Sequence, residues 1–530
     1  MPTDCITYQE SGFFSKIVID YLNQSPNLKT FYNHFPTIEN FEKQIDEKAT
    51  NYDFENRKIL VSELENQYKK INISETTLKN IQFLKDTNTF TITTGHQLNL
   101  FTGPLYFLYK IISTINLTIE LKAKYPKFNF VPIYWMATED HDFEEINFFN
   151  FKGKKIKWNQ DTSGPVGRFS TQGLDNVLAD FETQLGIGEN ALQLKNLFKK
   201  AYLTHQNLTQ ATRYLVNELF KNDGLVILDG DSKSLKNLFI PYMNEEIKNH
   251  SSYKKVVETN SKLSTDYSIQ INPREINLFY LEDNLRERII FENEKYKVNT
   301  TKIEFSQEEI LLEVEKNSNK FSPNVILRPL YQEVILPNLC YIGGGGELAY
   351  WLQLKANFDL NKVSFPMLLL RNSVLLVTKK QVEKVDKLNL SWKNLFSGQQ
   401  ELFVSKTKEF SNLKIDFSEQ KEFLKEQFKN LEHISNQTDK SFLGAVKAQE
   451  VKQLKGLDHL EKRLLKAEKR VHIDKLNRIF ELQDQLFPKQ ILQERIANFS
   501  EFYLEFGNDF ISTVQENLKP LDQNFTIINL

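Results

Sequence analysis

Residues 89–142 constrain the fold more than any other part of the chain, because strand-like and helix-like segments alternate there. Strand-forming residues alternate over Thr89–Thr93, and turn residues follow at 94–97 and at 102–104. The second turn ends in a proline, which suits the first turn of a helix. A second strand is predicted over Phe128–Trp135, which is apolar on both faces, as in a strand buried in a parallel sheet. This order predicts the beginning of a nucleotide-binding α/β domain.

Polar residues cluster where each of these two strands ends. The first cluster is Thr94-Gly95-His96-Gln97 and the second is Thr138-Glu139-Asp140-His141-Asp142. Ligands of open α/β sheets bind beyond the carboxyl ends of the strands, so both clusters are expected to face one crevice. The chain has only eight histidines, and His96 and His141 lie at these strand ends, where an imidazole could transfer a proton or contact phosphate. We therefore expect the active site in this crevice.

The composition argues against several other classes of protein. The 530 residues carry a formal charge of −2, so no net basic field favours nucleic-acid binding. The first residues lack the basic flank and apolar segment of an export signal, and no stretch approaches the roughly 20 apolar residues of a membrane span. We expect a cytoplasmic protein with no nucleic-acid partner and no membrane partner.

Cysteine usage predicts neither a disulfide nor a structural zinc site. Cys5 and Cys340 are the only cysteines, and neither has neighbours at metal-ligand spacing. Cys340 lies in an apolar segment, so it is expected to be a buried small residue rather than a nucleophile.

The pattern of apolar residues divides the chain into four parts. Residues 1–88 are predicted to form helical hairpins that pack over the sheet, and residues 89–398 an α/β core with insertions at about 151–222 and 250–320. Residues 399–487 are charged and helical, and residues 488–530 are predicted to return to the core. Further strands are predicted at Gly224–Gly230, Val325–Leu327, Leu339–Ile342, Phe365–Leu370 and Phe525–Leu530, and short antiparallel runs at Tyr267–Ile271, Ile276–Tyr280, Glu287–Phe291 and Lys295–Asn299.

The charged region has the pattern of a helical hairpin. Apolar residues recur at spacings of three and four, for example at Leu457, Leu460 and Leu464. This predicts an antiparallel pair of long helices, at about 401–435 and 440–486, separated near Ser435-Asn-Gln-Thr-Asp439. Because a lone helical hairpin buries little surface, we expect the pair to contribute to a homodimer. The alternative is an arm that folds onto its own core.

The two polar clusters each have a functional and a structural explanation. Gly95-His96-Gln97 could cradle a phosphate or carboxylate at a helix N-terminus, or could form a simple turn. The three carboxylates of Glu139–Asp142 repel one another unless a metal, an ammonium substrate or solvent lies among them. One interpretation is a solvated helix cap. The other is a carboxylate that holds the α-ammonium of an amino acid while His141 acts as acid or base.

A glycine run and two arginines are further candidates. Gly343–Gly346 precede Glu347 at the start of a predicted helix, and four glycines there are costly unless backbone must approach something closely. We expect ligand contact, although the run matches neither a P-loop nor a dinucleotide fingerprint. Arg328 and Arg371, each at a predicted strand end, could hold carboxylates or phosphates, or could form structural ion pairs.

Five motifs, in order along nearly the whole chain, form one combined pattern. They are TGHQ with FTGPLY within 94–106, EDHDFEE at 139–145, SPNVILRP at 322–329, YIGG with GELAYW within 341–351, and LQER at 492–495. Together they resemble the family of cysteine-adding enzymes of bacillithiol biosynthesis. Five motifs at matching spacing are far more specific than any one of them.

The resemblance implies a cysteine ligase that joins the carboxyl of cysteine to the amine of glucosaminyl-malate and so completes bacillithiol. It implies an α/β fold: a Rossmann-like nucleotide-binding core with insertions, plus a long α-helical antiparallel coiled-coil domain that forms a homodimer. The core is similar to that of class I aminoacyl-tRNA synthetases, which implies activation of the carboxyl by ATP, with Mg²⁺ if nucleotide phosphates are handled there. Two other functions stay open: a nonenzymatic nucleotide-binding scaffold or sensor, and a ligase that adds cysteine to another amine.

The resemblance also implies roles for individual residues. The catalytic group would be His141, as proton acceptor, with Asp140 and Glu139 beside it. Many family members have Gln where this chain has His96, which favours His141 over His96. The nucleotide would contact Thr94, Gly95, His96, Gln97, Gly343, Gly344, Gly345 and Gly346. The substrates would contact Asn99, Thr102, Asp142, Arg328, Glu347, Arg371 and Arg495, with the arginines on the malate carboxylates and an acidic residue on the cysteine ammonium.

Overall fold

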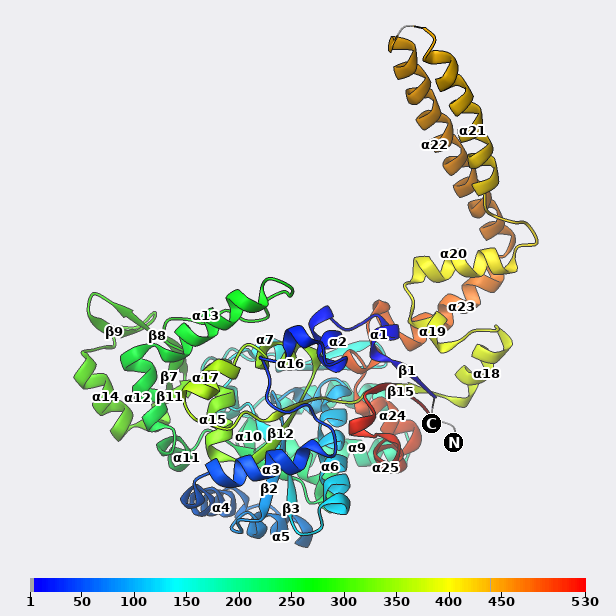
Figure 1. Cartoon of the computed structure of the whole chain (residues 1–530). Helices are drawn as coiled ribbons and strands as arrows, with labels where there is room; N and C mark the ends of the chain where they lie inside the picture. The colour runs from blue at the N-terminus through cyan, green and yellow to red at the C-terminus, as the bar shows by residue number, and fades with distance from the viewer. Residues whose placement is uncertain (1–3, 439) are drawn as a thin grey trace. The chain divides into compact units, whose positions relative to one another are not determined.

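The computed structural model describes residues 4–438 and 440–530, which divide into two compact units (Figure 1). The first unit contains the described part of Met1–Gln9 together with Phe13–Leu376 and Gln493–Leu530. The second contains Glu10–Gly12 and Val377–Leu492. The first unit is therefore built from segments that are far apart in the sequence.

A five-stranded parallel sheet lies at the centre of the first unit. Its strands are β2 (Thr89–His96), β3 (Asn129–Met136), β6 (Val226–Asp229), β12 (Asn338–Gly343) and β13 (Met367–Leu370). They are arranged in the order β13-β12-β2-β3-β6, with every neighbouring pair parallel. Counted along the chain this is the order of a Rossmann fold, and the order reverses between β2 and β12. The expected Rossmann-like core is confirmed.

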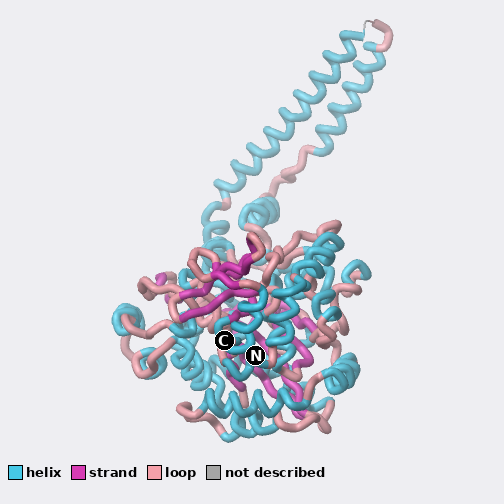
Figure 2. Tube along the Cα trace, turned by 90° about the vertical axis from the view of Figure 1, so that its left-hand side faces the viewer, coloured by secondary structure: helices cyan, strands magenta, loops and turns pink. Residues whose placement is uncertain are grey.

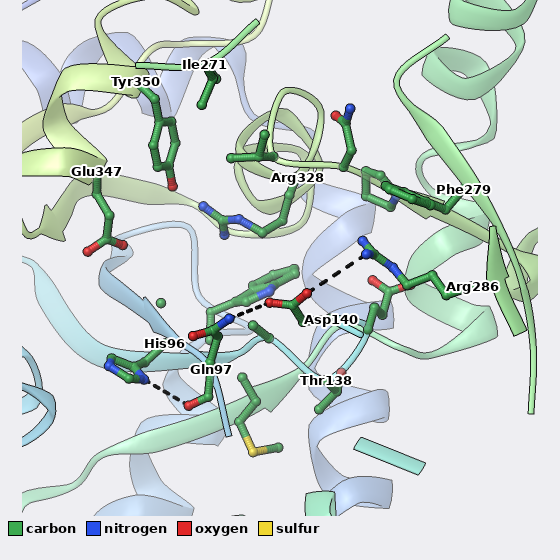
Figure 3. Close-up of a pocket in the computed structure, with 18 of the residues that line it drawn as sticks. His96, Gln97, Thr138, Asp140, Ile271, Phe279, Arg286, Arg328, Glu347 and Tyr350 are labelled. Carbon is green, nitrogen blue, oxygen red and sulfur yellow. Dashed lines mark hydrogen bonds and ion pairs between the residues drawn. The ribbon is translucent and has the colours of Figure 1, made fainter. Parts of the chain in front are cut away.

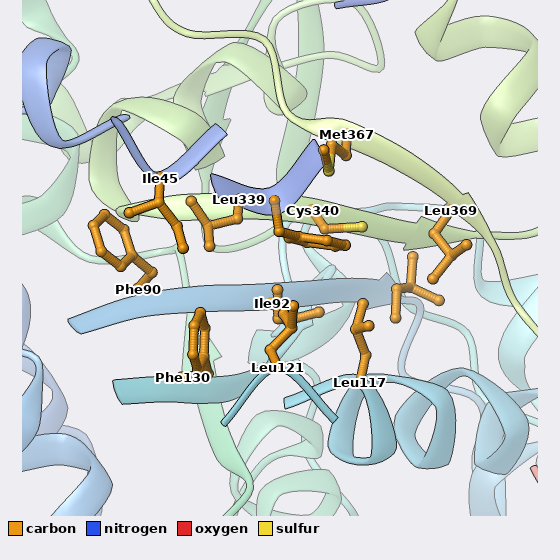
Figure 4. Packing of buried hydrophobic residues seen from close by; sticks show 12 residues of the cluster. Ile45, Phe90, Ile92, Leu117, Leu121, Phe130, Leu339, Cys340, Met367 and Leu369 are labelled. Atoms are coloured by element: carbon orange, nitrogen blue, oxygen red, sulfur yellow. The ribbon is translucent and has the colours of Figure 1, made fainter. Parts of the chain in front are cut away.

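The sheet is held by an apolar core that includes helix α6 (Tyr106–Lys124), the crossover from β2 to β3 (Figure 4). Alternate residues Phe90 and Ile92 of β2 pack against Leu117 and Leu121 of α6. Cys340 of β12 is buried in the same core, as predicted. Burial raises the pKa of its thiol well above the usual value, so this cysteine is a packing residue.

The first 88 residues are mostly helical, as predicted. The helices are α1 (Tyr8–Ser11), α2 (Lys16–Leu22), α3 (Asn40–Asn51), α4 (Phe54–Tyr68) and α5 (Glu75–Phe83). The prediction missed strand β1 (Asp4–Thr7), which pairs antiparallel with β15 (Asn524–Asn529) beside β14 (Ser373–Val377). A four-residue strand is too short to show a periodicity of its own. Its pairing partner also lies more than 500 residues away in the sequence.

Between β3 and β6 the chain forms α7 (Phe143–Ile146), the hairpin β4 (Phe148–Phe151) and β5 (Lys154–Lys157), and helices α8 (Leu174–Leu185), α9 (Glu189–Tyr202) and α10 (Leu208–Phe220). Between β6 and β12 lie α11 (Lys233–Asn237), α12 (Ile240–Asn249), α13 (Ser251–Leu263), α14 (Gln307–Lys316) and α15 (Arg328–Ile335). After β12 come α16 (Gly345–Trp351) and α17 (Lys355–Leu360).

A small antiparallel sheet lies within the second of these segments, as predicted. It contains β7 (Leu278–Glu282), β8 (Leu285–Glu292), β9 (Lys295–Val298), β10 (Glu304–Phe305) and β11 (Phe321–Pro323). Two strand predictions were wrong. Tyr267–Ile271 is irregular, and its backbone N–H groups at 270 and 271 bond to the Gln353 side chain instead of a strand. Val325–Leu327 is a turn, because the Asn324 carboxamide caps it by accepting from the N–H of Ile326.

The second unit contains a helical hairpin of α21 (Ser418–Ser435) and α22 (Lys440–Val471), which lie side by side in Figure 2. Its other helices are α18 (Lys379–Lys387), α19 (Trp392–Phe396), α20 (Gln399–Phe410) and α23 (Ile473–Leu486). The two long helices predicted from the sequence are each divided, after Phe410 and at His472. The predicted separating segment is found between α21 and α22, although Asp439 lies outside the described residues.

The final segment returns to the first unit and forms α24 (Phe499–Phe506), α25 (Asp509–Asn517) and β15. Asn498 anchors it by donating from its side-chain amide to the carbonyls of Phe101 and Gly103, at 2.8 and 2.5 Å. Phe101, Thr102 and Gly103 all have positive φ, a strained conformation for the first two. The C-terminal segment thus fixes the turn that follows β2.

Candidate functional site

A cavity of about 680 Å³ opens at the carboxyl ends of β2, β3 and β12, where the order of the central sheet reverses (Figure 3). The opposite wall comes from residues 271–288, which include parts of β7 and β8. Five cationic side chains line the cavity, against three acidic ones, so it favours anions. The charged lining residues are Lys110, Arg274, Arg286, Arg288, Arg328, Glu139, Asp140 and Glu347.

His96 lines the cavity as a neutral imidazole. Its Nδ1 lies 2.9 Å from the backbone oxygen of Gln97, and because a carbonyl can only accept, Nδ1 carries the proton. Burial, and to a smaller extent the nearby Lys110 cation, together lower the pKa of His96 to about 3, although the bond to Gln97 opposes the shift. This ring is therefore uncharged at neutral pH.

An ion pair between the buried Lys110 and the partly buried Glu347 lines the cavity. The Lys110 ammonium also donates to the Gly95 carbonyl at 2.7 Å, and burial lowers the pKa of this amine while Glu347 opposes the change. Glu347 accepts two further bonds, from the Tyr341 hydroxyl at 2.6 Å and from the Gly344 N–H at 2.8 Å. Both ends of the pair are thus held in place by the protein.

Arg328 points into the same cavity with one donor free. Its Nη1 donates to the Gln332 carboxamide oxygen at 3.0 Å, whereas its buried Nη2 has no acceptor in the described residues. Gln332 in turn donates to Glu333 at 3.0 Å, and Glu333 is paired at 3.0 Å with Lys48 of α3. A buried guanidinium with an open donor is suited to a carboxylate or phosphate oxygen.

Asp140 is the carboxylate of the cavity that stays ionised without a lysine partner. Gln97 donates to it at 2.7 Å and the His141 N–H at 2.8 Å, and Arg286 lies 3.9 Å away. Burial alone would raise the pKa of Asp140, but the His141 side chain at 3.5 Å, these two bonds and the Arg286 charge outweigh it and hold the pKa below its usual range.

His141 lies beside this carboxylate but is half exposed and does not line the cavity. Its Nδ1 is 2.7 Å from Arg286 Nη1. Because arginine only donates, Nδ1 must accept, and the proton of the neutral ring is on Nε2. The basic nitrogen that was predicted to take a proton from the substrate is thus already occupied.

Glu139 was predicted beside Asp140 as a catalytic carboxylate, and the structure pairs it with a buried lysine. Lys236 lies 2.6 Å from Glu139 and 3.0 Å from Asp231. Burial alone would lower the pKa of Lys236, but the two carboxylates hold it above its usual value. Arg168 grips Asp231 with two bonds, at 2.8 and 3.1 Å. This network of ion pairs holds Glu139 in place where it lines the cavity.

Several predicted contact residues lie outside the cavity lining. Thr94 donates to the Ile342 carbonyl between β2 and β12. Asn99 and Thr102 are buried in the turn after β2. Asp142 is the exposed N-cap of α7, where it accepts from the Glu145 N–H. Of the turn predicted to bind nucleotide, Gly95, His96 and Gln97 line the cavity.

The glycine run Gly343–Gly346 does not line the cavity either. A Cβ at Gly345 would lie 3.3 Å from Val18 of α2, and one at Gly343 would lie 3.0 Å from Glu347. The close approach inferred from the sequence therefore exists, but the approaching groups belong to the protein itself. Gly95 has the same explanation, because a Cβ there would lie 3.2 Å from the Tyr341 hydroxyl.

Two of the three predicted carboxylate-binding arginines also lie elsewhere. Arg371 is buried in a two-bond ion pair with Glu494, at 3.1 and 2.6 Å, which ties β13 to the C-terminal segment. Arg495 is exposed and does not line the cavity. Arg371 therefore forms a structural ion pair, which is one of the two alternatives that the sequence had left open.

Sequence reasoning missed Lys110, Lys236 and the arginines of the small sheet. Lys110 lies in the first turns of α6, which is otherwise apolar there. A single lysine in an apolar segment is a signal that could have identified it as a buried functional residue. Arg286 and Arg288 lie two apart on β8, a spacing that places them on one face of a strand. Nothing in the sequence links that strand to β2.

The described residues contain no group of three or more His, Cys, Asp or Glu side chains placed to hold a metal ion. None of the helices in 4–438 and 440–530 has the length and apolar character of a membrane span.

The fold and the site define a Rossmann-like α/β protein with a charged cavity at the sheet's switch point and a coiled-coil domain. The chain belongs to the BshC family of bacillithiol biosynthesis. Residues 1–372 match the family's N-terminal Rossmann-like domain, and residues 374–530 match its C-terminal coiled-coil domain. The resemblance inferred from the five motifs is confirmed.

Relatives from distant bacteria match over almost their whole length. The protein of Flavobacterium johnsoniae is 62% identical over 530 residues, which is all of both chains. That of Christiangramia forsetii is 57% identical over all of this chain and 99% of its own. That of Bacillus cytotoxicus is 27% identical over 97% and 98% of the two chains. Each is named "Putative cysteine ligase BshC".

Proposed function

We propose that this protein is a cysteine ligase that joins the carboxyl of cysteine to the amine of glucosaminyl-malate and forms bacillithiol. The observation that carries the proposal is the cavity at the switch point of a Rossmann-like sheet, which contains an ionised carboxylate and an arginine with an open donor. Family membership supports the same reaction, because the relatives are named as cysteine ligases.

The reaction needs an activated carboxyl, because an amide does not form spontaneously from a free carboxylate in water. In the proposed route, a cysteine carboxylate oxygen attacks the α-phosphorus of ATP and releases pyrophosphate. The sugar amine then attacks the acyl carbon, AMP leaves with the shared oxygen, and the amine proton passes to water. Holding the reactants side by side in one cavity supplies much of the rate enhancement.

The cavity contains groups of both signs for these reactants. Arg328 and Lys110 would bind the phosphate or adenylate oxygens near the turn after β2. Asp140 would hold the cysteine ammonium, since it is ionised and lines the cavity. Mg²⁺ would enter with the nucleotide phosphates, because Glu139 and Glu347 are already paired with lysines.

The decisive experiment incubates purified protein with cysteine, glucosaminyl-malate and Mg-ATP and detects bacillithiol and AMP by mass spectrometry. Product that appears only with ATP supports the proposal. Absence of product with or without ATP, together with normal bacillithiol in cells that lack the protein, would exclude it and favour the nonenzymatic scaffold or sensor. Exchange of the amine acceptor in the same assay tests the third function, ligation of cysteine to another amine.

We also infer a homodimer formed through the α21–α22 hairpin. A mainly apolar hollow of about 460 Å³, which three glutamines also line, lies between the two helices, and its lining residues Phe423 and Leu460 are 70% and 52% exposed. Gly456 leaves space in the lining of the hollow, since nothing lies within 4 Å of a Cβ placed there. Such a hollow can accept the side chains of a second hairpin as knobs in holes.

A further inference from the structure

The small antiparallel sheet presents a row of arginines to the cavity. Arg286 and Arg288 are two residues apart on β8, so their side chains leave the same face of the strand. Arg274 precedes β7, and all three side chains line the cavity opposite the carboxyl ends of the central strands. We call Arg274, Arg286 and Arg288 the arginine wall.

Arg286 is the central member of the wall and is incompletely bonded. Its side chain is 9% exposed, and the guanidinium carbon lies 3.9 Å from the centre of the Phe279 ring. Nη1 donates to His141, whereas the buried Nε has no acceptor in the described residues. A buried N–H without an acceptor is destabilising, so the site is suited to a ligand that supplies one.

The positive charge of the wall is only partly neutralised by the protein, through the 3.9 Å pair between Arg286 and Asp140. Asp140, the nearest carboxylate to Arg286, already accepts bonds from Gln97 and from the backbone of residue 141. Arg274 and Arg288 are exposed and form no ion pair with any Asp or Glu in the described residues. Burial lowers the pKa of Arg286 even though neighbouring carboxylates oppose the change, as expected for an undercompensated cation.

We infer that the arginine wall is the subsite for the carboxylates of the amine acceptor, and that the small sheet selects an acceptor that carries a dicarboxylate. This inference rests on the proposed ligase function. Three arginines match two carboxylates, because each guanidinium can offer a carboxylate two parallel N–H donors.

The other two reactants fit the wall less well. The cysteine carboxylate loses its charge when it is activated, so binding it through three fixed cations would stabilise the reactant more than the transition state. Nucleotide phosphates are expected near the turn after the first strand of a Rossmann-like sheet, where Lys110 and Arg328 lie. The carboxylates of the acceptor stay charged throughout the reaction, which suits a permanent cationic wall.

Binding of L-malate to the full-length protein tests the inference without turnover. Calorimetry should show that Arg286→Ala, Arg274→Ala and Arg288→Ala each weaken L-malate about tenfold or more, the cost of one charge-assisted contact. Arg286→Lys should recover only part of the affinity, because lysine lacks the fork. Arg478→Ala on α23 is the matched control, since this arginine is exposed and does not line the cavity. Malate affinity that is unchanged in all three wall variants overturns the inference.

Steady-state kinetics identifies the reactant that the wall binds. In the exposed-arginine variants Arg274→Ala and Arg288→Ala, the KM for glucosaminyl-malate should rise about tenfold while the KM values for ATP and cysteine stay within twofold. A rise in the KM for ATP instead would make the wall a phosphate site and overturn the inference. A wild-type protein that binds malate through the wall but forms no product would defeat only the proposed ligase function.

Discussion

Two histidines that follow successive strands have opposite hydrogen-bond roles. His96 donates from Nδ1 to a carbonyl, whereas His141 accepts at Nδ1 from Arg286. The sequence places both at strand ends and cannot show which nitrogen is free, because the partners come from the adjacent residue in one case and from 145 residues away in the other.

At His141 we predict that replacement by alanine lowers kcat less than about threefold. A general base contributes roughly 10²- to 10⁴-fold, and this imidazole has its basic nitrogen engaged by Arg286. Asp140→Asn is the contrasting variant, and it should raise the KM for cysteine about tenfold by removing the charge that faces the ammonium. Initial-rate kinetics distinguishes the two, and a loss of a hundredfold or more in His141→Ala would restore that residue as the base.

At His96 we predict a stability that falls in mild acid. The pKa is about 3 in the folded protein, below the ordinary 6.5, so the unfolded chain binds the proton first as the pH drops. The stabilisation is fully present above pH 6.5 and is lost as the pH falls toward 3. Between pH 7.5 and 5.5 the wild type should lose about 1.4 kcal/mol more than His96→Gln.

Urea unfolding followed by tryptophan fluorescence measures this difference. Trp135, Trp158 and Trp351 lie in the first unit, so three of the four tryptophans report on it. Equal acid sensitivity of the two proteins would show that His96 is protonated without penalty in the folded state.

At the scale of elements, helix α3 supports the site through a buried ion pair. Lys48 and Glu333 are almost fully buried, and Glu333 also accepts from Gln332, which holds Arg328, and from Asn338 of β12. The sequence predicted that α3 packs over the sheet. In the structure α3 also helps to orient the guanidinium of Arg328 in the cavity. Its lysine is one of many in the sequence, and only the folded packing distinguishes it from a surface residue.

We predict that Lys48→Met destabilises the first unit by about 3–5 kcal/mol, because Glu333 is left buried without its partner. The double variant Lys48→Met/Glu333→Gln should recover part of this loss. Lys16→Met breaks the solvent-exposed pair with Asp20 and should shift the urea midpoint far less, because solvent screens that pair. Urea midpoints measure all three, and similar values for Lys48→Met and Lys16→Met would contradict a role for burial.

The sequence was most informative about elements whose periodicity is local. The parallel strands were predicted to within a few residues, and α6 was predicted as a long helix, because each has its own apolar pattern. The helical hairpin was predicted too, although each of its two long helices is divided. Strand β1 and the turn at Val325–Leu327 were not, since pairing and capping partners decide them. Of the cavity's charged residues, Glu139, Asp140, Arg328 and Glu347 were predicted, whereas Lys110 and the arginine wall were not. No local pattern in the sequence links the opposite wall, residues 271–288, to the central strands.

At the scale of the whole molecule we predict a dimer that depends on the hairpin surface. Phe423→Glu and Leu460→Glu should each shift the protein toward monomer in analytical ultracentrifugation, because they place charge beside the apolar hollow. Ile187→Glu is the control, since this isoleucine is fully exposed and lies in the first unit. A dimer that persists in both hairpin variants would locate the interface elsewhere.

The return of residues 493–530 to the first unit has a consequence for synthesis. Asn498 holds the turn after β2, Glu494 neutralises buried Arg371, and β15 pairs with β1, yet all three are made after the helical hairpin. A nascent chain that has released the Rossmann-like sheet still lacks the groups that fix the turn after β2, pair with Arg371 and complete the sheet of β1. The first unit therefore completes its fold only after the C-terminal segment has left the ribosome, and a translation product that lacks residues 493–530 should be unstable.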